Sequence, residues 1–475
     1  MNSFLNPYNK QYGKVNNSII NLQLKDIIRM MYPDVANQNR IIDFFSNICT
    51  DRETIYYRQA ALKDVMFNRD LYHKLTDVII KMEKCYLSYS ANASGLSKAK
   101  LKSDTSITET TIILKDFAYC INELIGIYER LKEILKDKVS SKAFRDLLDI
   151  VNDVIENPKY QFMKEKITEL LESSGSFSFY SELDDRLSSV TTKYILSTGK
   201  YQGEKVSLFK KRDDKGKVEL DGKVKDDFKS LHIDAFYRTV VLLQDIFEYL
   251  FEKIAYLHKE HLFFDLGIAI YDKFWERGVN SVFPDISDET EYKYAYDPFL
   301  IVKYLQEDYH EKIYGNDFVI TKENDILVVG NNNSGKTVLM RTVGLLQILT
   351  QVGFAVPATL ARVALYDSIE TLFSGEENDT DVGGRFEKEV IEISEIINNV
   401  NSKSLIIINE IFQSTFAADG EEALFNILNY FSKINVKWIC VSHLLGITSR
   451  KDNFENNIDI YHTTDKENHY KIKKV

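Results

Sequence analysis

The sequence lacks the features that mark membrane and secreted proteins. No apolar run in its 475 residues approaches the ~18 residues that a membrane span needs. The segment from Met1 to Lys14 is polar rather than signal-like. The four cysteines are scattered without a CxxC pair, which predicts neither a zinc site nor a disulfide framework. We therefore expect a cytoplasmic protein with no membrane partner.

An excess of positive charge is also absent, because 60 Lys and Arg face 71 Asp and Glu. A net charge of −11 argues against an indiscriminate basic nucleic-acid binder, since the average field repels a polyanion. Residues 193–229 differ, with eleven basic against seven acidic residues, among them Lys210, Lys211 and Arg212. This stretch fits either a solvated region of mixed charge or a tip that contacts DNA phosphates.

Proline is rare, with six in the chain and three in the first 175 residues. Apolar residues recur there at helical spacing, which predicts an all-α core domain over 1–186, with an exposed loop at 88–111. Segments 190–196 and 205–209 favour β-structure and are separated by glycines, so we predict small hairpins in a β-rich, clamp-like insertion over 187–229. The chain is too long for one core.

The longest regular pattern is an apolar stripe that runs from Phe236 to Trp275 in alternating steps of four and three. It predicts a lever helix of ~30 residues or more, on the order of 45 Å long, within a segment 230–296. His261 lies on this stripe, with His258 and Asp265 one turn to either side. Both a metal site and a packed histidine fit that spacing, and the surrounding apolar residues favour the packed histidine.

Pro284 and Pro298 bracket a predicted linker, after which strands and helices alternate over 297–475. This order predicts a parallel sheet with helices on both faces. The candidate strands are 326–329, 405–408, 438–441 and 469–473, and the candidate helices begin at Thr337 and near Asp419.

The first of these strands ends in a GxxxxGKT pattern, typical of a loop that binds phosphate. Glycines let backbone N–H groups surround phosphate oxygens at the start of a helix. Lys336 would reach the β- and γ-phosphates of ATP, and the Thr337 hydroxyl would bind Mg²⁺. The alternative is a glycine-rich turn without nucleotide. The predicted nucleotide-binding residues are Gly330, Asn331, Asn332, Asn333, Ser334, Gly335, Lys336 and Thr337.

Polar residues also end the next two strands. Glu410 is placed to orient or deprotonate a water molecule that attacks ATP, and His443 to reach the γ-phosphate or that water. Asn409 would hold Mg²⁺ through water, but an amide adds no charge, so we expect weaker metal binding and slower hydrolysis. Strands that merely end in polar residues are the alternative interpretation.

Several segments resemble those of the MutS family of ATPases, most strongly over residues 325–450. The resemblance implies an α/β P-loop domain of the ABC type after the helical core and levers. The matching segments are 330–341 (phosphate loop), 351–358 (helix exit), 409–420 (strand carboxylates and Asp-Gly), 442–448 (Thr-His segment), 51–59 (start of the core) and 262–269 (lever).

The family further implies a homodimer in which a signature segment of one subunit caps the nucleotide of the other. That segment matches 381–389, where Gly384 and Arg385 replace the family's Ser-Thr. Arg385 would act as an arginine finger in trans, or is an ordinary surface arginine. Asp419 lies next to the interface by analogy.

The chain begins at the helical core and ends at Val475, so we expect no mismatch-reading, connector or C-terminal dimerisation element. The predicted function is an ATP-dependent clamp ATPase that binds structured DNA rather than mismatches. The rival prediction is a nucleotide-switched module that grips a protein partner, with little hydrolysis and no DNA binding.

Overall fold

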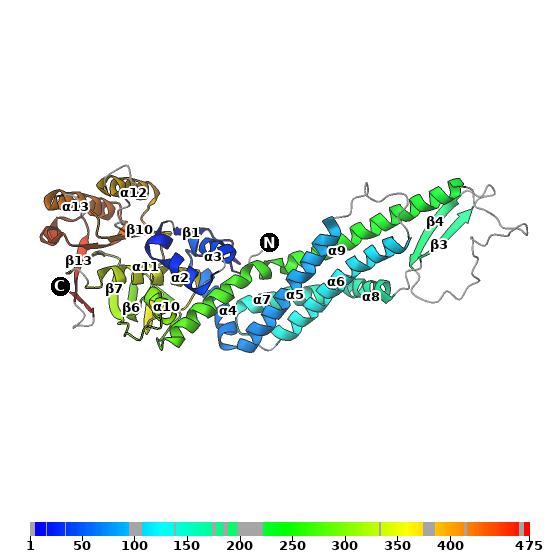
Figure 1. Cartoon of the computed structure of the whole chain (residues 1–475), viewed down its shortest axis with the longest axis horizontal. Coiled ribbons are helices and arrows are strands. Elements are labelled where there is room, and N and C mark those ends of the chain that lie inside the picture. Colours follow the sequence, from blue (N-terminus) through cyan, green and yellow to red (C-terminus); the bar gives the residue numbers. More distant parts are fainter. Residues whose placement is uncertain are drawn as a thin grey trace, which may run out of the picture. The chain divides into compact units, whose positions relative to one another are not determined.

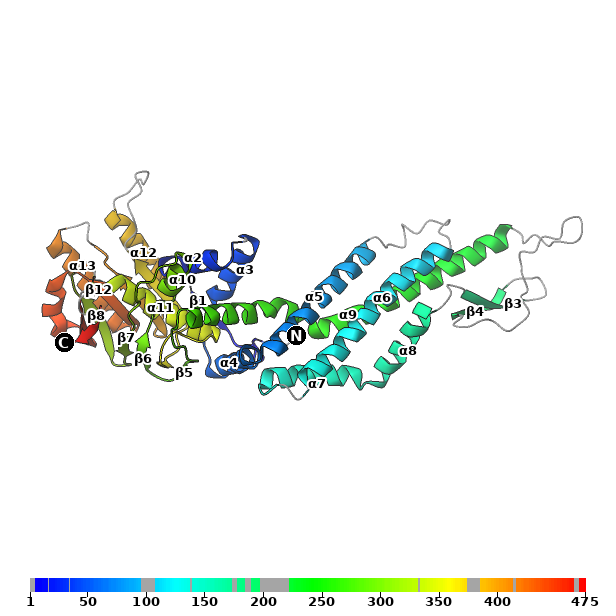
Figure 2. The same ribbon diagram turned by 60° about the horizontal axis from the view of Figure 1, so that its bottom comes forward.

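The chain divides into two units, the first formed by residues 1–66 with 262–475 and the second by residues 67–261 (Figures 1 and 2). The domain boundaries given above stay predictions. The computed structural model describes residues 5–15, 17–33, 35–94, 107–136, 139–172, 177–183, 189–196, 222–331, 334–373, 385–412, 416–464 and 470–475.

The first unit is built on an eight-stranded sheet in the order β14-β13-β8-β12-β11-β10-β1-β2. Its six inner strands are parallel, and β2 and β14 are antiparallel edges. The strands predicted at 326–329, 405–408 and 438–441 are confirmed. The fourth was misplaced, because only Ile472–Lys474 is a strand and it is antiparallel. The strands are β1 (Tyr12–Val15), β2 (Asn47–Cys49), β8 (Asn324–Val329), β10 (Ser368–Phe373), β11 (Ser404–Asn409), β12 (Lys437–Ser442), β13 (Asn457–Thr463) and β14 (Ile472–Lys474).

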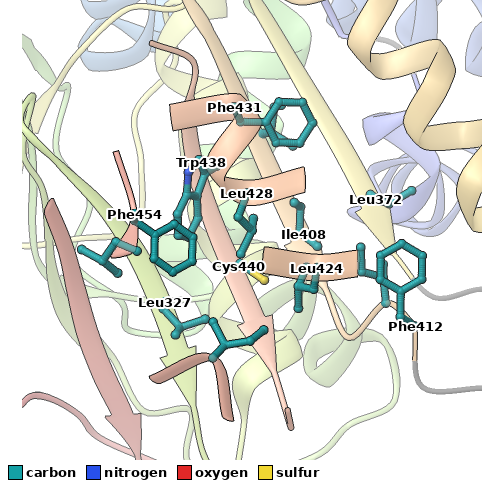
Figure 3. Close-up of a cluster of buried hydrophobic side chains, with 14 of the residues drawn as sticks. Leu327, Leu372, Ile408, Phe412, Leu424, Leu428, Phe431, Trp438, Cys440 and Phe454 are labelled. Atoms are coloured by element: carbon teal, nitrogen blue, oxygen red, sulfur yellow. The ribbon is translucent and has the colours of Figure 1, made fainter. Parts of the chain in front are cut away.

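Helices cover both faces of this sheet, as predicted. On one face, α12 (Arg385–Asn399), α13 (Ala417–Lys433) and the 3-10 helix η1 (Leu445–Asn453) enclose an apolar cluster around Trp438 and Phe431 (Figure 3). On the other face lies α11 (Lys336–Val352), whose Leu339 and Val343 surround the same small space as Ile439. Alternate residues of β8 face these two sides: Leu327 and Val329 belong to the cluster around Trp438, whereas Ile326 and Val328 line the space beside α11. The central strands β8, β11 and β12 are therefore mainly apolar.

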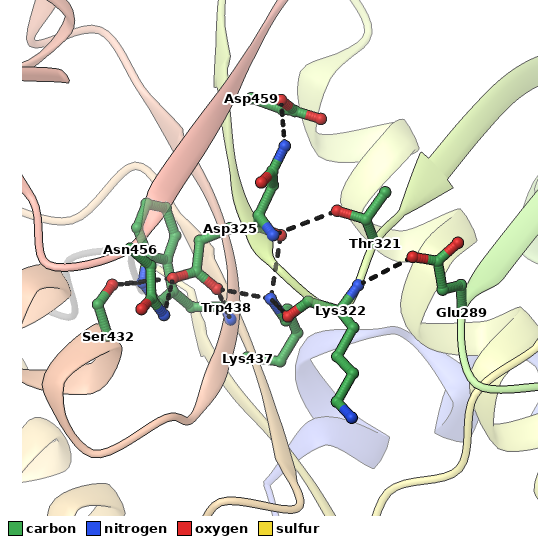
Figure 4. A network of polar contacts seen from close by, with 10 residues as sticks. Glu289, Thr321, Lys322, Asp325, Ser432, Lys437, Trp438, Asn456 and Asp459 are labelled. Carbon is green, nitrogen blue, oxygen red and sulfur yellow. Dashed lines mark hydrogen bonds and ion pairs between the residues drawn. The ribbon is translucent and has the colours of Figure 1, made fainter. Parts of the chain in front are cut away.

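A buried polar network closes the amino ends of the inner strands (Figure 4). The fully buried Asp325 carboxylate accepts hydrogen bonds from Ser432 Oγ at 2.8 Å, Lys437 Nζ at 3.1 Å and Asn456 Nδ2 at 3.2 Å. Trp438 Nε1 in turn donates to Ser432 Oγ at 2.9 Å. These bonds join β8, β12 and α13, so they stabilise the sheet on which the loop 330–337 is carried.

The N-terminal residues complete the sheet. β1 pairs in parallel with β10, and the Ser18 hydroxyl donates to the Ile369 carbonyl at 2.8 Å. A side chain at Gly13 would collide with the carbonyl of Asp367, so the close strand approach requires glycine there. β1 and its antiparallel neighbour β2 lie in a stretch predicted to be helical. The helices of this part are α1 (Ser18–Asn21), α2 (Leu24–Met31), α3 (Val35–Ser46) and α4 (Arg52–Phe67).

The linker predicted between Pro284 and Pro298 is wrong. The segment instead contributes to a second sheet of order β5-β9-β6-β7. Pro298 opens α10 (Pro298–Gln306), where Asp297 caps the helix by accepting from the Phe299 N–H at 2.8 Å. The strands are β5 (Asp285–Ile286), β6 (Thr290–Ala295), β7 (Asn316–Ile320) and β9 (Leu360–Val363).

The second unit is mainly helical, with α5, α6 and α9 side by side in both views (Figures 1 and 2). The stacked rings of Tyr89 and Phe247, with centroids 3.8 Å apart, join α5 and α9. The loop predicted at 88–111 is too long, because α5 includes Ser94 and α6 begins at Ile107. The helices are α5 (Arg69–Ser94), α6 (Ile107–Leu135), α7 (Lys142–Ile155), α8 (Pro158–Glu172) and α9 (Gly222–Glu276).

The predicted long helix is confirmed as the 55-residue α9, of which residues 262–276 belong to the first unit. Its stripe is buried from Phe236 to Leu257, but Trp275 at the end of the pattern is 76% exposed. His261 is a packed histidine: its Nε2 lies 3.0 Å from Thr76 Oγ1 and its ring stacks on Tyr72. The described residues contain no group of three or more side chains placed to hold a metal ion.

The predicted strand 190–196 lies in β4 (Ser189–Leu196), but its antiparallel partner is β3 (Phe177–Leu183). Segment 205–209 lies outside the described residues, as do Lys210, Lys211 and Arg212.

The four cysteines are free and buried. Burial raises the pKa of Cys49 to about 11 and of Cys85 to about 12. Among the described helices, none is both long and apolar enough to cross a bilayer.

Candidate nucleotide site

Three polar side chains meet at the carboxyl ends of three adjacent parallel strands. Lys336 follows β8, Glu410 follows β11, and His443 follows β12, which lies between the other two. Glu410 Oε1 lies 3.3 Å from Lys336 Nζ and 2.7 Å from His443 Nε2. The lysine side chain is 3% exposed, whereas those of Glu410 and His443 are 23% and 27% exposed. A carboxylate therefore links a buried cation to a histidine that solvent can reach.

The loop after β8 folds around the Lys336 ammonium group. Lys336 Nζ donates to the carbonyl oxygens of Gly330 at 3.0 Å and Asn331 at 2.8 Å. The buried Ser334 hydroxyl donates to the same Asn331 carbonyl at 2.6 Å, which keeps the loop closed. Asn332 and Asn333, which the sequence also predicted, lie outside the described residues.

Glycine is required at both ends of this loop. Gly335 immediately precedes α11 with φ +82°, a conformation that L side chains rarely adopt. A side chain at Gly330 would collide with the Thr463 hydroxyl on β13. The glycines of the GxxxxGKT pattern therefore allow a positive φ and a close packing contact at a helix N-terminus, where backbone N–H groups favour anions.

Two oxygen donors lie beside the loop. Thr337 Oγ1 donates to Asn409 Oδ1 at 3.5 Å, and their predicted role in binding Mg²⁺ stays a prediction. Hydroxyl and amide oxygens are suitable ligands for Mg²⁺, directly or through water. Neither carries a charge, so this donor set fits the ion but would hold it less firmly than a set with a carboxylate.

A cavity of about 840 Å³ opens beside these groups, and sequence reasoning missed its far wall. Tyr304, Tyr314 and Tyr470 line it, and the ring centroids of Tyr314 and Tyr470 are 6.3 Å apart. The Tyr470 ring lies against Gly335, and Asn316 Nδ2 donates to the Tyr470 carbonyl at 3.1 Å. The density of tyrosines between 292 and 314 was the available signal.

The residues predicted to act across a subunit interface lie on two other helices. Arg385 is the first residue of α12, and its side chain lies outside the described part of the structure. Asp419 is exposed in the first turn of α13. Their roles stay predictions.

Comparison with known proteins points to one family. The family model for MutS domain V matches residues 326–474. The DNA mismatch repair protein MutS of Clostridium botulinum is 32% identical over 149 residues, and that of Finegoldia magna is 35% identical over 157. The DNA mismatch repair protein MSH3 of Lodderomyces elongisporus is 30% identical over 189 residues.

These similarities cover 30%, 32% and 37% of this chain, but only 16%, 18% and 18% of the respective relatives. The chain thus matches less than one fifth of the length of these curated proteins. The matched region contains the loop 330–337, Asn409, Glu410 and His443. Residues 326–474 of this chain therefore belong to the MutS domain V family.

Proposed function

We propose that this chain binds ATP at the loop 330–337, hydrolyses it with the help of Glu410, and uses the nucleotide to control a clamp on structured DNA. The observation that carries the proposal is the chain of contacts Lys336–Glu410–His443 across adjacent strand ends. Parallel strands bring their carboxyl ends together, and this is where open α/β sheets bind ligands.

In the proposed binding mode, the phosphates of ATP contact the loop 330–337 and the base contacts the cavity wall. Backbone N–H groups at the start of α11 receive phosphate oxygens, and Lys336 exchanges the carbonyls of Gly330 and Asn331 for them. Tyr314 and Tyr470 offer aromatic surface for the base on the wall of the cavity.

Thr337 and Asn409 would hold Mg²⁺, which would neutralise charge that develops on the phosphates. Glu410 then orients or deprotonates the attacking water, while His443 fixes the carboxylate at 2.7 Å. Lys336 offsets negative charge in the transition state. In a homodimer, Arg385 would add a cation to the site of the other copy, with Asp419 at the interface.

Substitution of Glu410 tests the catalytic part. Glu410→Gln should lower kcat roughly 100-fold or more, because it removes the base, while the Kd for ATP changes by less than about threefold. The exposed Glu395→Gln on α12 is the matched control and should behave as wild type. Unchanged turnover in Glu410→Gln would place the base elsewhere, and failure of the wild type to bind ATP would end the whole proposal.

The DNA part rests on family membership and on the basic stretch with Lys210, Lys211 and Arg212. Changing these three to alanine should weaken binding to forked and four-way DNA and reduce its dependence on salt. Changing the exposed Lys433 and Lys451 instead should do neither. If the wild type bound none of these DNA forms at any salt concentration, the proposed clamp function would be wrong.

Asn409 supports a second candidate, a nucleotide-switched module that grips a protein and turns ATP over negligibly. Its uncharged oxygen lies near Thr337, where a carboxylate would bind Mg²⁺ more firmly. This candidate predicts tight ATP binding without measurable phosphate release in the presence of DNA.

A further inference from the structure

The turn that carries Glu410 has an unusual backbone. Glu410 has φ +56° and Phe412 has φ +61°, so two non-glycine residues adopt the left-handed region within three positions. L side chains rarely adopt this conformation, and it persists only where neighbouring groups hold it in place. The direction in which the Glu410 carboxylate points therefore depends on what fixes this turn.

Three contacts within the described residues help to fix it. The Glu410 N–H donates to the Val441 carbonyl at 3.0 Å, which ties the start of the turn to β12. The Phe412 ring is 1% exposed within the apolar cluster under α13 (Figure 3). The Phe412 N–H donates to Glu389 Oε2 at 2.9 Å.

The third contact differs from the other two because its acceptor comes from α12. Glu389 is 4% exposed, and it lies one turn after the first residue of that helix, Arg385. A buried carboxylate that accepts from a backbone N–H is a strong, directional link. A shift of α12 along its axis would therefore pull on the turn that holds Glu410.

We infer that Glu389 is a positioning residue, which fixes the turn from Glu410 to Phe412 and couples the catalytic carboxylate to the position of α12. The inference rests on the proposed role of Glu410. It adds a route by which anything that moves the start of α12, such as a second copy of this chain, changes the rate of hydrolysis without contacting the water.

Single-turnover hydrolysis of radiolabelled ATP, together with the Kd for ATP, tests the inference. Glu389→Ala should lower the rate roughly ten- to a hundredfold, because small misplacements of a catalytic group have effects of this size. The Kd should change by less than twofold, because Glu389 is not among the residues that line the cavity. Glu389→Gln keeps an acceptor for the Phe412 N–H and should restore the rate to within about threefold of wild type.

The matched control is Glu387→Ala, two positions away on α12 and exposed, which should hydrolyse ATP at the wild-type rate. If Glu389→Ala does not fold, Glu389→Asp decides, since it withdraws the acceptor by one methylene and should show the same loss of rate at unchanged Kd.

Wild-type rates in both the Ala and Asp variants would overturn the inference, as would a Gln variant as slow as the Ala variant. A loss of rate with an equal loss of ATP affinity would also overturn it, because that pattern indicates general disruption. Failure of the proposed function looks different, since wild type itself would then neither bind nor hydrolyse ATP.

Discussion

The two ends of the central sheet carry the same kinds of side chain in opposite settings. At the amino ends, Asp325 is fully buried and accepts from four donors, one of them Lys437. At the carboxyl ends, Glu410 contacts the buried Lys336. The Glu410 side chain, however, is 23% exposed and lines a cavity of about 840 Å³. A carboxylate and a lysine stabilise the fold where protein surrounds them, and they can serve a ligand where part of their surroundings is a cavity.

Disrupting the Asp325 network at the amino ends of the strands should have the largest effect on stability. Asp325→Ala leaves Lys437 and the Ser432 hydroxyl without their buried acceptor, so we expect a loss of about 3–5 kcal/mol in the free energy of unfolding. Urea titration followed by Trp438 fluorescence measures it. Asp452→Ala, at an exposed position, should stay within about 0.5 kcal/mol of wild type. A similar loss in both variants would remove the contrast between the two ends.

A change at the carboxyl ends of the strands should instead alter the affinity for ATP. Lys336→Ala removes a charged donor to the phosphates, worth roughly 1.5–3 kcal/mol or about ten- to a hundredfold in the Kd for ATP. Its free energy of unfolding should change by less than about 1 kcal/mol, because water in the cavity can replace the lost bonds. Calorimetric titration with ATP checks the affinity, and the exposed Lys322→Ala is the control. An unchanged Kd would contradict the assignment of the site.

A negative charge added at the carboxyl ends of the strands should strengthen the proposed metal site. Asn409→Asp places a carboxylate near Thr337, so Mg²⁺ affinity and ATP turnover should rise about tenfold, in the range typical of groups that support a metal. Turnover at varied Mg²⁺ measures both. A slower variant would show that the amide is needed for a reason other than metal binding.

The smallest effect on stability is expected from Ser432, an uncharged member of the Asp325 network. Ser432→Ala removes the donor to Asp325 and the acceptor of Trp438 Nε1, at a cost of about 1–2 kcal/mol in unfolding free energy. Ser394→Ala, whose hydroxyl donates to a carbonyl on the exposed side of α12, is the control and should be nearly neutral. Equal stability of the two variants would mean that water replaces the Ser432 hydroxyl.

The sequence predicted that Lys336, Glu410 and His443 lie together because their positions follow a local rule. β8, β11 and β12 are mainly apolar strands followed by polar residues, and parallel pairing brings those ends together. Lys336, Glu410 and His443 were found in this way, and so was α9, whose pattern repeats over many turns.

What sequence reasoning missed depends on partners far apart in the chain. β1 has four residues and no period to detect, and its pairing with β10 is set by a glycine that allows close approach. The hydrogen bond from Phe412 N–H to Glu389 depends on where α12 lies, which no local pattern encodes. Trp275 continued an apolar stripe but is exposed, because periodicity records spacing and not the presence of a packing partner.

The pairing of β1 with β10 sets when the central sheet can be completed during synthesis. Ser18 and its acceptor Ile369 are 351 positions apart, so at ~5–20 residues per second the ribosome needs roughly 20 to 70 s between them. β1 must wait for that interval before its parallel neighbour β10 exists, although its antiparallel neighbour β2 is made early. The sheet that carries the loop 330–337 is therefore completed late, after the helices encoded between its two parts have emerged.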